Sequence, residues 1–262
     1  MTDQTMSAPA AQQFTIGHVL GTSFAVLGRN IIPFVIIAIL ISIPSFIVSR
    51  IVPIDVQIYQ NAASQQQHLL YFYSLGSKAS WINTGASLIT SSLITAALVY
   101  GTFQHLRGQR AAIGDLVARG LSSLLPVLMA AIAFTVLSLI GFLLLLIPGV
   151  IIIVALWVYV PAIVVEKKGV VAAFRRSREL TKGRRWSILA LYILVLVALV
   201  AVEVIVTSLL HIPFALLTIH WAAIPIRILY MVFIAVMSAV GYYYLRADKE
   251  GVAIGDIAKV FD

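Results

Sequence analysis

Long apolar stretches alternate with short polar connectors along most of the chain. Six of these stretches approach or exceed the roughly 20 apolar residues that a helix needs to cross the hydrocarbon core of a bilayer. We expect membrane spans at about residues 31–52, 84–104, 124–146, 150–165, 186–210 and 222–245. The pattern predicts an all-α polytopic membrane bundle of six transmembrane helices, with one transmembrane domain over residues 14–246.

Three shorter segments with helical spacing of apolar residues precede the odd-numbered spans. They cover residues 14–29, 111–122 and 170–182, and we expect each to form a short amphipathic helix in the membrane interface on the cytoplasmic side. An Ile-Gly pair followed by a polar residue occurs at 16–18 and 113–115 and recurs at 254–256. This recurrence fits three parallel repeats, and it equally fits chance in a chain rich in Ile and Gly.

Positive charges predict the orientation of the spans. Of the 18 Lys and Arg residues, 15 lie at Arg29, in the connectors 105–122 and 166–185, and in the tail after the sixth span. Only Arg50 and Lys78 lie in the opposite set of connectors. By the positive-inside rule we expect a bacterial inner-membrane protein with both termini in the cytoplasm. The polar ends, residues 1–13 and 247–262, are expected to be cytoplasmic tails, the first of them disordered.

Composition agrees with the hydropathy pattern. The chain is 61% hydrophobic and 11% charged, with a mean hydropathy of +1.03, whereas about a quarter of the residues in a soluble domain are charged. The net charge of +8 would suggest nucleic-acid binding in a soluble protein, but these cations lie beside span ends. We therefore expect membrane lipids, anionic ones among them, and a membrane-protein partner, but no nucleic acid.

Residue groupings typical of catalysis or metal binding are not found in the sequence. There is no cysteine, so disulfides, thiolate metal sites and a cysteine nucleophile are excluded. The five histidines show no metal-ligand spacing with carboxylates. Paired carboxylates, a Ser-His-acid arrangement and a phosphate-binding glycine loop cannot be identified. We expect no metal, no cofactor and no enzymatic activity.

The connector 166–185 carries the densest positive charge. Within 170–182 one helical face is uncharged and the other is basic. Cations near an anionic leaflet gain roughly 1 kcal/mol each, so we expect this cluster to bind anionic lipids. Its members are Arg175, Arg176, Arg178, Lys182, Arg184 and Arg185. The alternative is that these charges only enforce topology and solubility.

Two charged residues interrupt the apolar spans. Glu203 lies about midway along the fifth span, and Arg227 lies near the outer end of the sixth. A charge at the bilayer centre costs about 2.5–3.5 kcal/mol on insertion scales, so it requires a partner, a proton or water. We predict an intramembrane polar pair, which is either a structural ion pair or part of a polar pathway. Hydroxyl residues Ser87, Ser91, Thr95 and Thr102 share nearly one face of the second span, which favours helix packing over a solvated pathway.

One region resembles a known family. Its residues are Ile147-Pro148-Gly149-Val150, Trp157 to Ala162, Val164-Val165-Glu166, Ala172 to Ser177 and Leu180 to Gly183. This region resembles the membrane domain of glycerophosphoryl diester phosphodiesterases and related stand-alone six-span bacterial proteins. The resemblance implies an inner-membrane domain concerned with lipids or with a partner protein. Phosphodiesterases of that family act through a separate soluble barrel with acidic metal ligands, which this chain lacks, so the activity is not carried over.

The expected function is that of a non-enzymatic integral membrane protein that organises lipids or partner proteins. The alternative is a transporter or channel-like protein for a small or amphiphilic substrate, using the polar site around Glu203 and Arg227. An intramembrane lipid-modifying enzyme ranks third. A water-filled cavity reaching Glu203 favours transport, a lateral opening favours lipid handling, and a tightly packed bundle favours scaffolding.

Overall fold

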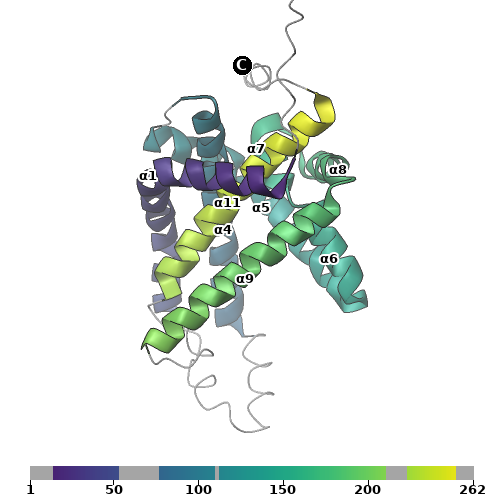
Figure 1. Cartoon of the computed structure of the whole chain (residues 1–262). Helices are drawn as coiled ribbons and strands as arrows, with labels where there is room; N and C mark the ends of the chain where they lie inside the picture. Colours follow the sequence, from purple (N-terminus) through teal and green to yellow (C-terminus); the bar gives the residue numbers. More distant parts are fainter. Residues whose placement is uncertain (1–13, 53–76, 110–111, 211–222, 252–262) are drawn as a thin grey trace, which may run out of the picture.

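The structure, a computed structural model, describes residues 14–52, 77–109, 112–210 and 223–251 (Figure 1). This part of the chain holds eight helices and no strand. Six spans are formed by α1 (Ile16–Ile51), α4 (Lys78–Leu106), α5 (Ile113–Leu144), α6 (Leu146–Ala155) together with α7 (Tyr159–Glu166), α9 (Arg185–Leu210) and α11 (Ala223–Glu250). The remaining helix, α8 (Val170–Thr181), is short. The predicted all-α bundle of six membrane-spanning helices is confirmed, while the expected tail 1–13 and residues 252–262 lie outside the described residues.

The first two amphipathic segments are not separate helices. The helix α1 starts at Ile16, where the Thr15 hydroxyl accepts a hydrogen bond from the His18 N–H, and continues into the first span. In the same way α5 starts at Ile113 and continues into the third span. The expected breaks after residues 29 and 122 are therefore wrong, because the prolines that follow, Pro33 and Pro126, lie inside the helices. A proline removes one backbone hydrogen bond and bends a helix without having to end it, and Figure 1 shows the first half of α1 crossing one end of the bundle.

Polar contacts pair α1 with α4 as antiparallel neighbours. The Ser45 hydroxyl donates to the Ala86 carbonyl at 2.9 Å, and the Asn83 amide donates to the Val52 carbonyl at 2.9 Å. At the other end, the Asn30 amide lies 2.9 Å from Nδ1 of His105. Side-chain hydrogen bonds of this kind compensate for the weak hydrophobic drive between helices in lipid.

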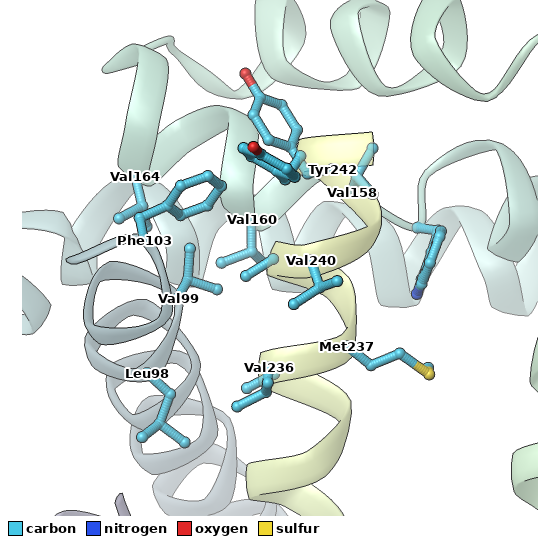
Figure 2. Close-up of a cluster of buried hydrophobic side chains, with 14 of the residues drawn as sticks. Leu98, Val99, Phe103, Val158, Val160, Val164, Val236, Met237, Val240 and Tyr242 are labelled. Carbon is cyan, nitrogen blue, oxygen red and sulfur yellow. The ribbon is translucent and has the colours of Figure 1, made fainter. Parts of the chain in front are cut away.

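The core joins α4, α7 and α11 (Figure 2). Buried side chains come from α4 and α11 and from the fourth span: Leu98, Val99, Phe103, Val158, Val160, Val164, Val236, Met237, Val240 and Tyr242. A close approach is possible at Gly241, where a Cβ atom would lie 2.2 Å from the Trp157 ring. The core therefore depends on a residue without a side chain.

The tyrosine triplet 242–244 is also part of the core. Tyrosines at the end of a span are typical of the membrane interface, but these three are no more than 8% exposed. The first half of α1 covers Tyr244, because the Thr22 and Tyr244 hydroxyls are 2.8 Å apart and the His18 ring stacks on Tyr244. Tyr242 instead packs on Phe103 of α4 and donates a hydrogen bond to Glu166. Contacts with segments distant in sequence thus bury these rings.

The fourth span is broken. Between α6 and α7, Leu156, Trp157 and Val158 leave the helical path. The turn expected at residues 147–149 instead lies at Leu145, whose backbone is extended (φ −170°, ψ 158°), and Pro148 falls in the first turn of α6. Proline is tolerated there because its missing N–H has no partner in a first turn. The third span accordingly ends at Leu144 rather than at residue 146.

Candidate functional site

Helix α8 satisfies the backbone groups that the broken span leaves free. The Ser177 hydroxyl donates to the Ala155 carbonyl at 3.0 Å and accepts from the Val158 N–H at 3.2 Å. The Thr181 hydroxyl also donates to the Ala155 carbonyl, at 3.2 Å. An unpaired backbone group at membrane depth costs several kcal/mol, so irregular backbone occurs there only with such partners or beside water. These two hydroxyls therefore hold the break in place.

The uncharged face of α8 packs on protein rather than on lipid. Ala173, Ser177, Leu180 and Thr181 are at most 1% exposed. The helix contacts α7, α11, α5 and α6. The expectation that this face lies in the membrane interface is therefore wrong. The spacing predicted an apolar face correctly, but spacing alone does not distinguish a lipid surface from a protein surface as its partner.

The six expected lipid-binding cations fall into two groups. Arg176 is paired with Glu166 at 2.8 Å and also with Glu250, while Arg184 forms a two-pronged pair with Asp248 at 2.9 and 3.0 Å. Burial lowers the pKa of the Arg176 guanidinium, but the hydrogen bonds to Glu250 and Glu166 outweigh burial and raise that pKa. The hydrogen bond to Asp248 likewise raises the pKa of Arg184. Both side chains are committed to the protein.

The other four cations have no ion pair within the described part of the chain. Arg175, Arg178 and Lys182 are exposed on the basic face of α8 and at its end. Arg185, the first residue of α9, is half-buried, and its Nε atom is buried without a hydrogen-bond partner among the described residues. Arg185 therefore differs from the rest of the cluster, because a buried cationic donor is favourable only with an acceptor.

A groove of about 410 Å³ lies between α6 and the first turns of α9. Its walls are apolar apart from Arg185 and Trp186, and its other members are Leu146, Ile147, Val150, Ile151, Val154 and Leu189. Trp186 is 83% exposed. In Figure 1, α6 and α9 run in different directions away from this point. The α6–α9 groove thus joins an apolar wall to a cation and an aromatic ring.

A smaller cavity of about 190 Å³ lies beside the broken span. Ser91, Ser92 and Thr95 of α4 face it, together with Trp157 and Tyr159 of the broken span and with Tyr192 and Ser238. The Ser92 hydroxyl and the Trp157 Nε1 are buried without hydrogen-bond partners among the described residues. A polar cavity of this size can hold ordered water.

The cavity uses only part of the hydroxyl face expected on the second span. Ser91 and Thr95 reach the cavity, Thr102 is buried and donates to the Leu98 carbonyl, and Ser87 is exposed. Ser92 was missed because it lies one residue outside the four-residue spacing on which the prediction relied. Only the tertiary structure places it beside Trp157.

Glu203 and Arg227 do not form the expected pair. Both belong to the described part of the chain, and no ion pair joins them there. Glu203 is half-buried on α9, and Arg227 is exposed on α11. The prediction assumed a closed hairpin, but α9 packs mainly on α6 and α1, and an apolar opening of about 540 Å³ lies between α1, α9 and α11.

The described residues contain no group of three or more His, Asp, Glu or Cys that could hold a metal ion. His18 stacks on Tyr244 and His105 contacts Asn30. His68, His211 and His220 lie outside the described residues.

Comparison with known proteins identifies one family. A family model described as a domain of unknown function, DUF7847, matches residues 86–248. This match covers more than half of the chain, and the chain therefore belongs to that family. No curated protein and no solved structure matches the chain.

Proposed function

We propose that this member of the DUF7847 family is a non-enzymatic membrane protein that binds phospholipids, and that the α6–α9 groove is its lipid site. The observation that carries the proposal is the combination, in one groove, of apolar walls with the half-buried Arg185 and the exposed Trp186. A phospholipid has the same division between an apolar chain and an anionic phosphate. The groove is chemically complementary to such an amphiphile.

The chemistry of each part of the groove supports this proposal. Phosphate oxygens accept charge-assisted hydrogen bonds from arginine, and the Nε of Arg185 is a buried donor without a partner among the described residues. Tryptophan favours the level of lipid headgroups, where its ring contacts both chains and water. The aliphatic side chains of α6 then provide a surface for an acyl chain below that level. Anionic phospholipids are the preferred class because the polar member of the groove is a cation.

The orientation proposed from the sequence has structural support. Ion pairs link Lys168 and Arg176 to Glu166, and Arg184 to Asp248. The basic connector after the fourth span and the end of the sixth span thus share one end of the bundle. We assign this end to the cytoplasm of a bacterial inner membrane on the positive-inside rule. Reporters fused after Gln109 and Lys168 should be cytoplasmic, and those after Gln66 and Phe214 external, and an external reporter at Lys168 would reverse the assignment.

The resemblance to phosphodiesterase membrane domains supports a role with lipids or with a partner protein. The residues that carry the resemblance belong to α6, α7 and α8, next to the proposed lipid site. A partner membrane protein remains part of the proposal, because the exposed apolar walls of α9 suit either lipid or another helix.

The cavity beside the broken span favours a second candidate function, transport of a small polar substrate. Broken helices and polar residues near the middle of the membrane are typical of transporter binding sites. Three hydroxyl residues of α4 line the cavity, and one of them, Ser92, is buried, but neither Glu203 nor Arg227 lines it. A transporter would therefore use the cavity rather than the pair expected from the sequence.

Native mass spectrometry of the full chain, extracted with its lipids, tests the lipid site. The Arg185→Gln variant should retain less anionic phospholipid, whereas Val150→Trp, which fills the groove, should retain less phospholipid of every headgroup. The matched controls are Arg178→Gln, an exposed cation of the same cluster, and Val197→Trp, an exposed position on α9 outside the α6–α9 groove. Equal lipid retention by all four variants and the wild type would refute the proposed site.

A further inference from the structure

A second, polar pocket lies at the end of the bundle that carries the basic connectors. Its volume is about 480 Å³. Three segments form it: the end of α4, the first turns of α5 and the turn after α7. Its members are Tyr100, Gln104, Arg107, Asp115, Ala118, Arg119, Ser122 and Lys167. None of them belongs to the basic cluster that the sequence singled out.

Three cations and one carboxylate face this pocket. Arg107, Arg119 and Lys167 come from three different segments, and Asp115 is the only acid. None of the five ion pairs found among the described residues involves Arg119 or Lys167. Cations brought together in a concave site create a positive potential that attracts anions. The fold therefore leaves an excess of positive charge in an open, concave site.

Arg119 is held in position by its neighbours. Its guanidinium lies over the Tyr100 ring, 5.6 Å from the ring centre, and its Nε is buried without a hydrogen-bond partner among the described residues. The Tyr100 hydroxyl in turn accepts a hydrogen bond from the Gln104 amide at 2.6 Å. The Gln104 Oε1 is then buried without a partner there. The pocket thus contains a fixed cationic donor and a buried acceptor.

The backbone conformation at Lys167 also shapes the pocket. Its φ of 52° lies in the left-handed region, which costs free energy for a residue other than glycine. Its neighbour Lys168 pairs with Glu166 at 2.5 Å, while Lys167 itself lines the pocket. The turn therefore separates two consecutive lysines, one for an internal ion pair and one for the pocket.

We propose that this pocket binds a phosphate group, with Arg119 and Lys167 as its anchoring cations. Arginine donates in pairs to phosphate oxygens, lysine adds a mobile charge, and the Gln104 oxygen accepts the hydrogen of a P–OH group. The phosphate belongs either to a soluble phosphate compound or to a lipid headgroup. The site is independent of the α6–α9 groove, since the two share no residue.

Inorganic phosphate is the first probe. The full chain in neutral detergent is melted with increasing phosphate, and chloride keeps the ionic strength constant. A ligand that binds the folded state raises the unfolding midpoint. Arg119→Gln should weaken phosphate binding about tenfold, a change of about 1.4 kcal/mol. Asp115→Asn should strengthen it several-fold, because the variant removes the only opposing charge in the pocket, and damage to the fold cannot produce such a gain.

Lys167→Gly separates binding from folding. Glycine relieves the left-handed backbone, so this variant should melt at the same or a higher temperature without phosphate and still bind phosphate less well. Lys182→Gln, which removes an exposed cation outside the pocket, is the matched control and should bind like the wild type.

Nanodiscs of phosphatidylglycerol or phosphatidylcholine identify the source of the phosphate. If Arg119→Gln and Lys167→Gly retain less phosphatidylglycerol than the wild type, and free phosphate does not stabilise the wild type, the phosphate belongs to a lipid headgroup. Stabilisation by free phosphate that depends on the same residues indicates a soluble compound. If neither measurement distinguishes these variants from the wild type, the proposal is overturned. Arg185→Gln lies outside this pocket and should leave stabilisation by free phosphate, and its dependence on Arg119 and Lys167, unchanged, so failure of the α6–α9 groove is a separate result.

Discussion

The helices of one bundle differ sharply in how much they pack against one another. In an apolar 18-residue segment of α4, 50% of the residues are buried, and in that of the broken fourth span 61% are buried. In the corresponding segment of α9 the buried share is 17%. The first two spans also receive polar contacts from other helices, such as the bond from Ser177 of α8 to Ala155 and the contact of Asn30 of α1 with His105 of α4. Within its described part, α9 uses its Thr207 hydroxyl only on its own backbone. In a bilayer, apolar area does not drive helices together, so small residues and hydrogen bonds decide which helices pack closely.

This difference assigns separate tasks to two regions. The packed region, made of α4, α7, α8 and the end of α11, holds the break in the fourth span and borders the proposed phosphate pocket. The open region, made of α9 and the exposed face of α6, presents the apolar walls that we propose for lipid. Changes in the packed region should affect the stability of the protein, and changes in the open region should affect the lipids it retains.

The largest expected effect is at the contact between Gly241 and Trp157. The added methyl group of Gly241→Ala would lie 2.2 Å from the Trp157 ring, and overpacking of this kind costs about 1–3 kcal/mol or more. The control Gly21→Ala meets no atom within 4 Å and should be neutral or stabilising by up to about 1 kcal/mol, because alanine favours helix. Thermal unfolding in detergent measures both, and similar midpoints for the two variants would contradict the packed interface.

The next effect is at Ser177. Ser177→Ala leaves the Val158 N–H without a partner and removes one of the two donors to the Ala155 carbonyl, at a cost of about 1–3 kcal/mol. Thr135→Val on α5 is the matched control, since its hydroxyl donates only to the Ala131 carbonyl of its own exposed helix face. Hydrogen exchange at residues 155–159 should increase in the first variant alone. Unchanged exchange there would show that α8 does not hold the break.

A smaller effect should separate two adjacent arginines. Arg176→Gln removes ion pairs to Glu166 and Glu250 and should destabilise the protein by about 1 kcal/mol, while Arg175→Gln, at an exposed site, should change stability by less than about 0.5 kcal/mol. In a double-mutant cycle, Arg176→Gln and Glu250→Gln should be coupled. Equal effects of the two arginine variants would mean that both only contribute surface charge.

The smallest expected effect concerns Glu203 and Arg227. Because no ion pair joins them in the described part of the chain, Glu203→Gln and Arg227→Gln should be additive within about 0.5 kcal/mol in a double-mutant cycle. Recovery of stability in the double variant would show that the two residues meet, and that the open region closes in solution. The same thermal assay as for Gly241 is sufficient.

Much of the local structure was predictable from the sequence. The six spans were recognisable because each apolar run gains free energy in lipid on its own, whatever its neighbours do. Their boundaries were less predictable. The sequence suggested the start of a span at Pro33 and a turn at Pro148, yet Pro33 lies inside α1 and Pro148 lies in the first turn of α6. Proline is common both near a helix start and at a turn, so the local sequence alone does not distinguish the two cases.

The candidate sites were predictable only in part. The density of cations in the connector 166–185 was evident, but Arg176 and Arg184 turned out to be paired within the protein, while Arg185 lies in a groove. Arg119 and Lys167 were not singled out, because they belong to different connectors and meet only through the fold. The carboxylates that pair with Arg184 and Arg176 are Asp248 and Glu250, which lie about 70 residues further along the chain.

The sequence by itself determined that the chain is helical, that it lies in a membrane, and which of its connectors are basic. These properties depend on the transfer of each segment between water and lipid, which is a local free energy. The tertiary structure alone decided that α8 packs on a broken span, that residues 242–244 are buried with Tyr244 against α1, and that α9 stands apart from α11. Such choices depend on pairs of groups distant in sequence, because hydropathy provides almost no preference between lipid and another apolar helix as a neighbour.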